Sequence, residues 1–355
     1  MKKTTMLLLA LCLLLSACGK EPQETTEPTH PSPATEATQM PTTAPTETVK
    51  PEPAAMNPLT GEALEEKNDS RPYAIMLNNH EAALPHHGVG AADVIYETCV
   101  EGGMTRYMAI FSDPAKAGPI GSIRSARPPF VDVIKSYDAV YCSASAMQNV
   151  LEMVSERDID YLNALTSDYF YRDKDRLAKN IAYEHTLFVE GEDLVNFAKD
   201  KDYRQTRQPD AEYGFVFDES VPFGGEAGEK IQISFQNGGK KTAAQYDQEL
   251  GAYTLSQYGI EYVDGNTDEK VPFRNILILN ANRWVMSNGI HVQMDTVGEG
   301  TGYYARDGRI VPIKWSRKDV DEPFTYTLED GKPLYFGVGK TYTAIIQDGA
   351  PVEYQ

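Results

Sequence analysis

Two β-rich runs separated by Gly102-Gly103 constrain the fold of this chain more than any other segment. Residues 94–101 and 104–111 are both rich in β-branched and aromatic side chains. A Gly-Gly pair readily adopts the positive φ angles of a tight hairpin turn. The pattern therefore predicts two antiparallel strands joined by a two-residue turn.

The register of that hairpin would bring charged side chains together. A two-residue turn pairs Cys99 with Arg106, and side chains alternate along a strand. Glu97, Cys99 and Glu101 would then share one face, with Arg106 within reach of both carboxylates. Such a group could be an acid/base pair, a metal site or an anchor for a polar ligand. A salt-bridge cluster that only fixes the register is the interpretation favoured by the hairpin alone.

The pattern around the hairpin changes near residue 205. Strands and helices alternate before that point, with strands expected over 71–78, 139–143 and 185–189 and helices over 130–137, 145–156 and 193–199. Strands and turns dominate after it, with strands expected over 230–236, 242–246, 252–258, 274–280, 290–297, 302–306, 309–315, 324–328, 332–336 and 341–347. The predicted fold class is α/β (α+β). It combines a mixed sheet with helices in residues 57–205 and a mostly antiparallel β part in residues 206–355.

The first residues read as a targeting segment. Lys2 and Lys3 precede a short apolar run, and small residues then lead to Cys18. This order predicts a secretory signal peptide over 1–17 that ends in a lipobox, with Cys18 as the lipidated N-terminus. The apolar run is too short for a transmembrane helix, which needs about 20 apolar residues. The predicted cellular location is therefore the outer face of the cytoplasmic membrane, where the lipid would anchor the protein.

Residues 18–56 link this anchor to the folded part. They are rich in Pro, Thr and Glu and carry no apolar core, so we expect a disordered tether. The whole chain has a formal net charge of −19, which does not suit binding to nucleic acid. Cys99 and Cys142 could form a disulfide or remain buried thiols, and no zinc-type cysteine spacing is present. No metal and no cofactor are expected, and the oligomeric state stays open.

A second polar segment, residues 118–127, precedes Pro128-Pro129. It contains Ser125, Arg124 and Arg127, and arginine forks suit carboxylate or phosphate groups. A helix that begins after the segment would also attract anions. The segment could hold an anionic ligand, or its arginines could simply pair with nearby carboxylates. It lacks the Gly-Lys-Ser/Thr ending of a phosphate-binding loop.

Histidines are few. His86-His87 follows Pro85 and reads as an exposed loop pair, for which adventitious metal binding is the only functional idea. His185, with Arg172 and Asp173 upstream, could act as a base. A satisfied core histidine is the commoner outcome for such a residue.

Taken together, these segments resemble a known family. Matching motifs are Asn57-Pro-Leu-Thr-Gly61, Arg71-Pro72, Ala92-Asp-Val-Ile-Tyr-Glu97, Val100-Glu-Gly-Gly-Met-Thr-Arg106 and Gly118-Pro with Arg124-Ser-Ala-Arg127. They resemble the YerB-like lipoprotein family, known mainly as a domain of unknown function. The resemblance implies an envelope lipoprotein of a Gram-positive bacterium, without an agreed activity. It also implies that residues 57–205 and 206–355 pack as one globular unit, a layered sandwich. From this resemblance, the candidate ligand-binding residues of this chain are Glu97, Glu101, Thr105, Arg106, Arg124, Ser125 and Arg127.

The leading hypothesis is a non-catalytic binding protein for an anionic ligand, a wall fragment or an envelope partner. Arg106, Arg124 and Arg127 would meet the anionic group, oriented by Glu97 and Glu101. The alternative is a hydrolase or transferase on wall polymers. Its candidate catalytic residues are Glu101 or Glu97 with His185, and Arg172. The resemblance also implies a histidine after the central strand, where this chain has 141–145 without one, so an enzyme is disfavoured.

Overall fold

The computed structural model describes residues 55–355. The predicted signal peptide, the lipidation site at Cys18 and nearly all of the predicted tether lie outside the described residues. Within 55–355, none of the helices has the length and apolar character that crossing a lipid bilayer requires.

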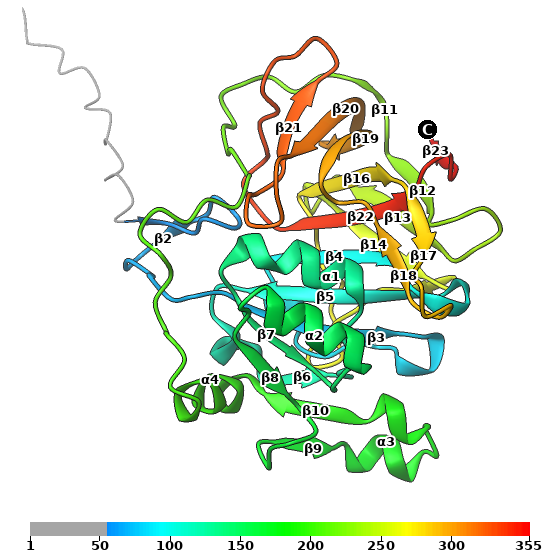
Figure 1. Cartoon of the computed structure of the whole chain (residues 1–355). Coiled ribbons are helices and arrows are strands. Elements are labelled where there is room, and N and C mark those ends of the chain that lie inside the picture. Colours follow the sequence, from blue (N-terminus) through cyan, green and yellow to red (C-terminus); the bar gives the residue numbers. More distant parts are fainter. Residues whose placement is uncertain (1–54) are drawn as a thin grey trace, which may run out of the picture. The chain divides into compact units, whose positions relative to one another are not determined.

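The largest sheet has eleven strands and takes strands from both sides of residue 205. In spatial order they are β11 (Glu226–Ala227), β20 (Arg309–Arg317), β19 (Gly298–Arg306), β16 (Asn275–Ala281), β22 (Thr341–Gln347), β4 (Val94–Cys99), β5 (Thr105–Phe111), β3 (Tyr73–Asn79), β7 (Val140–Ser143) and β8 (Tyr161–Asn163), with β21 (Thr325–Leu328) on β20. Figure 1 shows the red strand β22 beside the cyan strand β4, and the two pair in parallel. Both are almost wholly buried, as strands covered on two faces are. The core therefore runs through the centre of this sheet.

Smaller sheets complete the β structure. A five-stranded antiparallel sheet contains, in order, β15 (Ile260–Glu261), β14 (Ala252–Gln257), β13 (Lys241–Asp247), β12 (Lys230–Ser234) and β23 (Val352–Tyr354). A three-stranded sheet contains β6 (Pro119–Gly121), β10 (Leu187–Glu190) and β9 (Phe170–Arg172). Two hairpins are formed by β1 (Ala55–Met56) with β2 (Ala63–Leu64) and by β17 (Arg283–Val285) with β18 (Val292–Met294).

The α-helices are short and lie in the part of the chain where helices were predicted. They are α1 (Pro128–Ile134), α2 (Gln148–Glu156), α3 (Lys174–Ala178) and α4 (Gly191–Asp200). Every residue of α1 is buried, and α1 packs against α2 and β18 (Figure 1). The described residues are thus mainly β with few helices, so the predicted mixed sheet is present but the predicted α/β layering is met only in part.

One predicted strand is missing. Residues 332–336 form two isolated bridges, Pro333 with Thr327 and Phe336 with Phe217, instead of a strand. Proline has no N–H to donate to a ladder, which weakens pairing along this segment.

The β4–β5 hairpin differs from its predicted register by one residue. The connection is a 3-10 turn (η3, Glu101–Gly103), closed by a bond from the Val100 N–H to the Met104 carbonyl at 2.9 Å. Arg106 consequently pairs with Thr98, not with Cys99. Because side chains alternate along a strand, a shift of one residue moves Arg106 to the other face of the sheet. The prediction that Glu97 and Arg106 share a face is therefore wrong, whereas Glu101, in the turn, lies near enough for its charge to act on Arg106.

The two cysteines inside the described residues are both buried free thiols. Cys99 lies in β4 and Cys142 in β7, and they form no disulfide. Burial raises the pKa of the Cys99 thiol to about 12 and raises that of Cys142 further. Of the two alternatives left open by the sequence, the structure has the buried thiols.

Candidate functional site

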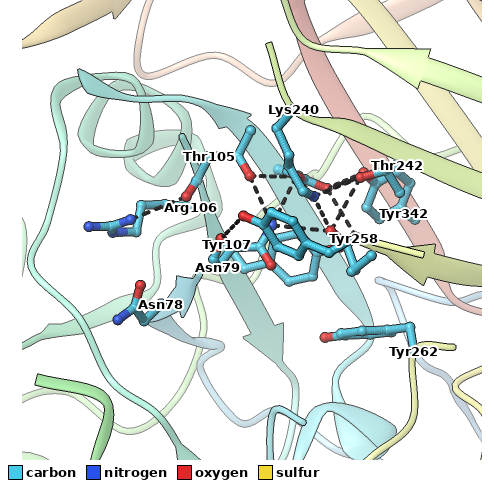
Figure 2. A network of polar contacts seen from close by, with 12 residues as sticks. Asn78, Asn79, Thr105, Arg106, Tyr107, Lys240, Thr242, Tyr258, Tyr262 and Tyr342 are labelled. Atoms are coloured by element: carbon cyan, nitrogen blue, oxygen red, sulfur yellow. Dashed lines mark hydrogen bonds and ion pairs between the residues drawn. The ribbon is translucent and has the colours of Figure 1, made fainter. Parts of the chain in front are cut away.

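The central sheet separates the predicted site residues into two groups. Glu97 and Thr105 lie on one face, where Thr105 donates to Glu97 at 2.6 Å. Arg106 lies on the other face, and Figure 2 shows Arg106 and Asn78 directed away from the side chains around Lys240. The structure thus places Glu97 and Thr105 together and separates both from Arg106.

Three arginines gather on the Arg106 side, and we call them the arginine cluster: Arg106, Arg124 and Arg127. Arg106 projects from β5. Arg124 and Arg127 belong to the segment that crosses the end of β3 on its way to α1, where the Arg124 N–H donates to the Met76 carbonyl at 2.9 Å. The three guanidinium groups are close enough for the charges of Arg127 and Arg124 to act on Arg106.

Arg106 is a buried cation without a counter-ion. Its side chain has 2% of its surface exposed, and no carboxylate within 55–355 lies within 4 Å of it. Nη1 donates to the Thr105 carbonyl at 3.2 Å, and Nε has no partner. Burial, followed by the charges of Arg127 and Arg124, lowers the pKa of Arg106 to about 10, and the charge of Glu101 offsets this only in part. A bound anion would offset this unfavourable burial.

Arg127 has partners for its whole guanidinium. Nε donates to both oxygens of Glu101 at 2.7 and 2.9 Å, Nη2 also donates to Glu101, and Nη1 donates to the Ala126 carbonyl at 2.9 Å. Burial would raise the pKa of Glu101, but Arg127 lowers it to about 2. Glu101 is therefore an ionised carboxylate at neutral pH and has no proton to give as a general acid.

Arg124 keeps a donor free in the arginine cluster, and Ser122, two residues before it in the chain, keeps another. Arg124 Nη2 reaches Glu184 at 3.3 Å near the surface, while its Nε is buried without a partner. The Ser122 hydroxyl is likewise buried and unpartnered. The predicted ligand residue Ser125 instead donates to the Ala144 carbonyl at 3.1 Å.

The start of α1 contributes little to this site. Arg127 is the N-cap, and the first two helical positions are Pro128 and Pro129. Proline carries no N–H, so these positions offer no donor to an anion. The anion attraction expected from this helix start is missing for that reason.

His185 lies beside the arginine cluster, whereas Arg172 has other contacts. His185 Nδ1 accepts from Asn78 Nδ2 at 2.5 Å, and Asn78 pairs across the strands with Arg106. Burial lowers the pKa of His185, and the nearby arginines lower it further. Arg172 donates to the Tyr183 carbonyl at 2.7 Å and stacks 3.9 Å above that ring. This geometry gives Arg172 no evident part in the site.

His291 is a further candidate for the site, and the sequence did not reveal it. It is fully buried before β18, and its Nδ1 accepts from Asn149 and Asn288, each at 3.1 Å. Its Nε2 therefore carries the hydrogen and has no partner. The charges of Arg127 and Glu101 reach this ring. No local motif marks this histidine, because only the fold brings it to residues 101–127.

Glu97 is the centre of a separate buried network. It forms an ion pair with Lys240, whose side chain is 3% exposed. Its oxygens also accept from Thr242 at 2.9 Å, Asn79 at 2.9 Å and Tyr342 at 2.5 Å (Figure 2). Burial would raise the pKa of Glu97, but Lys240 brings it below its usual value. Glu97 thus connects the large sheet with the five-stranded sheet and does not orient the arginine cluster.

The His86-His87 pair was predicted to be exposed, and this is wrong for His86. The His86 ring is fully buried, with Nε2 2.7 Å from the Asn78 carbonyl and Nδ1 3.0 Å from the Tyr262 hydroxyl. Burial lowers its pKa to about 4. In the part of the chain that the structure describes, no cluster of three or more His, Cys, Asp or Glu side chains is arranged to hold a metal.

A surface hollow of about 400 Å³ lies elsewhere on the molecule. Its lining includes Arg71 and Lys135 but has more carboxylates, among them Asp138 and Asp210. Arg71 already pairs with Asp138 and Asp160. The hollow does not suit an anion, so the arginine cluster remains the better site.

Comparisons with known proteins give the family. The model described as "Protein of unknown function (DUF3048) N-terminal domain" matches residues 59–204, and the DUF3048 C-terminal domain matches 231–343. "Putative lipoprotein YerB" of Bacillus subtilis (strain 168) is 27% identical over 296 residues, which are 82% of this chain and 86% of the relative. The crystal structure of the YerB protein from Bacillus subtilis has the same fold, with a TM-score of 0.73 at 24% identity over 84% of this chain and 99% of that one. The chain belongs to the YerB-like family, whose two domains are both described as being of unknown function.

Proposed function

We propose that this chain is a lipid-anchored binding protein of the cell envelope that captures an anionic ligand without catalysing a reaction. The observation that carries the proposal is Arg106, a buried guanidinium with no carboxylate partner in the described residues. A carboxylate or phosphate group is the natural partner for a free guanidinium edge.

Polar groups of the arginine cluster and of the segments beside it support this role. Arg124 Nε, Ser122 Oγ and His291 Nε2 are buried polar atoms without partners, and the charge of Arg127 reaches His291. Buried polar atoms nearly always have a partner, so these atoms favour a ligand site at the arginine cluster. Arg127 adds positive potential but donates its own N–H groups to Glu101.

The location of the protein is part of the same proposal. The lipobox ending at Cys18 and the name of the Bacillus relative both favour a lipid anchor on the outer face of the membrane. The tether over 18–56 would let the binding part reach a wall fragment or an envelope protein. Ligands with carboxylate or phosphate groups are available there.

The hydrolase or transferase alternative has less support. Glu101 is ionised and paired with Arg127, and Glu97 is fully buried on the other face from His185 and Arg106. General acid/base catalysis needs a group whose pKa lies near the working pH and that reaches the substrate. Neither carboxylate has both properties.

Titration of the full chain in detergent with inorganic phosphate and, separately, acetate tests the proposal. We expect saturable binding of at least one anion by calorimetry, lost in Arg106→Met and retained in Arg309→Gln. Arg309 is an exposed arginine of β20, so its substitution removes the same charge outside the site. Absence of saturable binding of both anions by the unaltered chain would overturn the proposal.

A further inference from the structure

The buried network around Glu97 contains the groups of an acyl-transfer reaction. Lys240 supplies an amine, Gln257 a carboxamide, and Glu97 a carboxylate. Glu97 and Gln257 are fully buried, and Lys240 is 8% exposed. Lys240 Nζ contacts both Gln257 Oε1 and Glu97 Oε1, so the amine lies next to a carbonyl group and a base.

Glu97 bridges the amine and the amide nitrogen. Its Oε1 accepts from Lys240 Nζ, while its Oε2 lies 3.4 Å from Gln257 Nε2. One carboxylate can therefore take a proton from the amine and give it to the departing nitrogen. Burial lowers the pKa of Lys240, which favours the neutral, nucleophilic amine.

One further donor lies beside the oxygen of the Gln257 carbonyl. Asn79 Nδ2 is 3.4 Å from Gln257 Oε1, whereas the Thr242 hydroxyl gives its one hydrogen to Glu97 at 2.9 Å. Negative charge that develops on the Gln257 oxygen during attack would be stabilised by the Asn79 amide. Figure 2 shows Asn79 and Thr242 in the same network as Lys240.

Aromatic rings enclose the amine. Lys240 Nζ lies 5.8 Å from the centre of the Tyr107 ring and 5.4 Å from those of Phe235 and Tyr258. Their bulk excludes water, which would otherwise compete with the amine for the carbonyl. The site therefore excludes reactants from solution, and it contains the amine, the carboxamide and the carboxylate that the reaction needs.

We propose that Lys240 and Gln257 form an intramolecular amide crosslink. Glu97 takes one proton from the Nζ ammonium, and the freed Nζ amine attacks the Gln257 side-chain carbonyl carbon. Glu97 gives this proton to Gln257 Nε2, and then passes on in the same way the second proton that Nζ loses. The bond from carbon to Nε2 breaks, Nε2 leaves as ammonium, and Glu97 is ionised again. The new bond joins Nζ to the carbonyl carbon, so the step needs no oxidant and no further reactant. The crosslink would fasten β14 to the loop before β13, and it does not depend on anion binding at the arginine cluster.

Peptide mapping of the full chain tests this proposal. Trypsin cuts after free lysines, so an unmodified chain releases 231–240 and 242–270 as separate peptides. We expect instead a single species in which 231–241 is joined to 242–270, with a mass one ammonia below their sum. Glu97→Gln and Lys240→Arg should abolish the joined species. Lys241→Arg, at the exposed neighbour, should keep it.

Three results would overturn the proposal. The first is complete release of 231–240 from the unaltered chain. The second is loss of ammonia without joined peptides, which would indicate a succinimide at Asn237-Gly238. The third is Lys240 joined to the peptide that contains Asn79, which would assign the reaction to the other carboxamide. The map of the unaltered chain decides among these results even if the Glu97 variant does not fold.

Discussion

Glu97 and Arg106 lie on neighbouring strands of the central sheet, and their side chains leave it through opposite faces. Glu97 has Lys240 as its counter-ion, together with several hydroxyl and amide donors. Arg106 has two neighbouring arginines and no carboxylate partner in the described residues. One face of the sheet therefore holds a compensated ion pair, and the other holds a cation that lacks its partner.

Arg106→Met should leave the ligand-free protein as stable as before, or more stable by about 1 kcal/mol. The methionine fills similar space, and the cost of burying an uncompensated charge disappears. Urea unfolding measures the free energy of unfolding, with Arg309→Gln as the exposed control. A loss of more than about 2 kcal/mol would assign Arg106 a structural role instead.

Glu101→Gln should tighten the binding of phosphate several-fold. The change removes a negative charge near the site and frees the Arg127 fork that Glu101 now occupies. Calorimetric titration measures the dissociation constant, and Glu299→Gln, at an exposed position of β19, is the matched control. Weaker binding in Glu101→Gln would show that the carboxylate orients Arg127 toward the ligand.

Glu97→Ala should destabilise the fold by about 3–5 kcal/mol. Without Glu97 the proposed crosslink cannot form, so Lys240 stays a buried ammonium without its counter-ion, and Thr242 and Tyr342 lose their acceptor. Glu229→Ala, at an exposed position between strands, should change the free energy of unfolding little. If urea unfolding gave a loss below about 1 kcal/mol, the network would not hold the two sheets together.

Acid should destabilise the protein between pH 6.5 and pH 4, partly through His86. Burial lowers the pKa of His86 from 6.5 to about 4. Between these values the His86 imidazole is mostly protonated in the unfolded chain and mostly neutral in the folded chain. Stability is therefore present above pH 6.5 and lost as the pH falls, by about 3 kcal/mol for this group.

His86→Gln should flatten this part of the pH dependence. Other histidines with lowered pKa values, such as His185 and His291, should keep some of the slope. Urea unfolding at pH 6.5 and pH 4.5 measures the change, with His30→Gln, in the predicted tether, as control. Equal slopes in His86→Gln and the unaltered chain would contradict the assignment.

Most strands could be predicted because each depends on a local pattern. The runs at 94–99, 105–111, 275–281 and 341–347 carry enough β-branched and aromatic residues to read as strands without tertiary information. The hairpin turn could not be predicted to the residue, because Gly102 and Gly103 fit both a two-residue turn and a 3-10 turn. That single choice decides which face Arg106 occupies.

The candidate site was predicted only in part, because the sequence shows local patterns but not the contacts between distant segments. Arg106, Arg124 and Arg127 do gather, although Glu97 and Thr105 belong to another network. Contacts such as Lys240 with Glu97 join segments that are far apart in the chain, and no spacing rule reports them. His291 next to the cluster is a further example.

The central claim is that Arg106 binds an anion directly. The most direct test is an NMR titration of the full chain, labelled with ¹⁵N-arginine, with inorganic phosphate. The Arg106 Nε–H signal is assigned by its absence in Arg106→Met. Saturable shifts of the Arg106 and Arg124 Nε–H signals, with the Arg309 signal unchanged, are the predicted result. An Arg106 signal that stays in place at saturating phosphate and acetate would contradict the account.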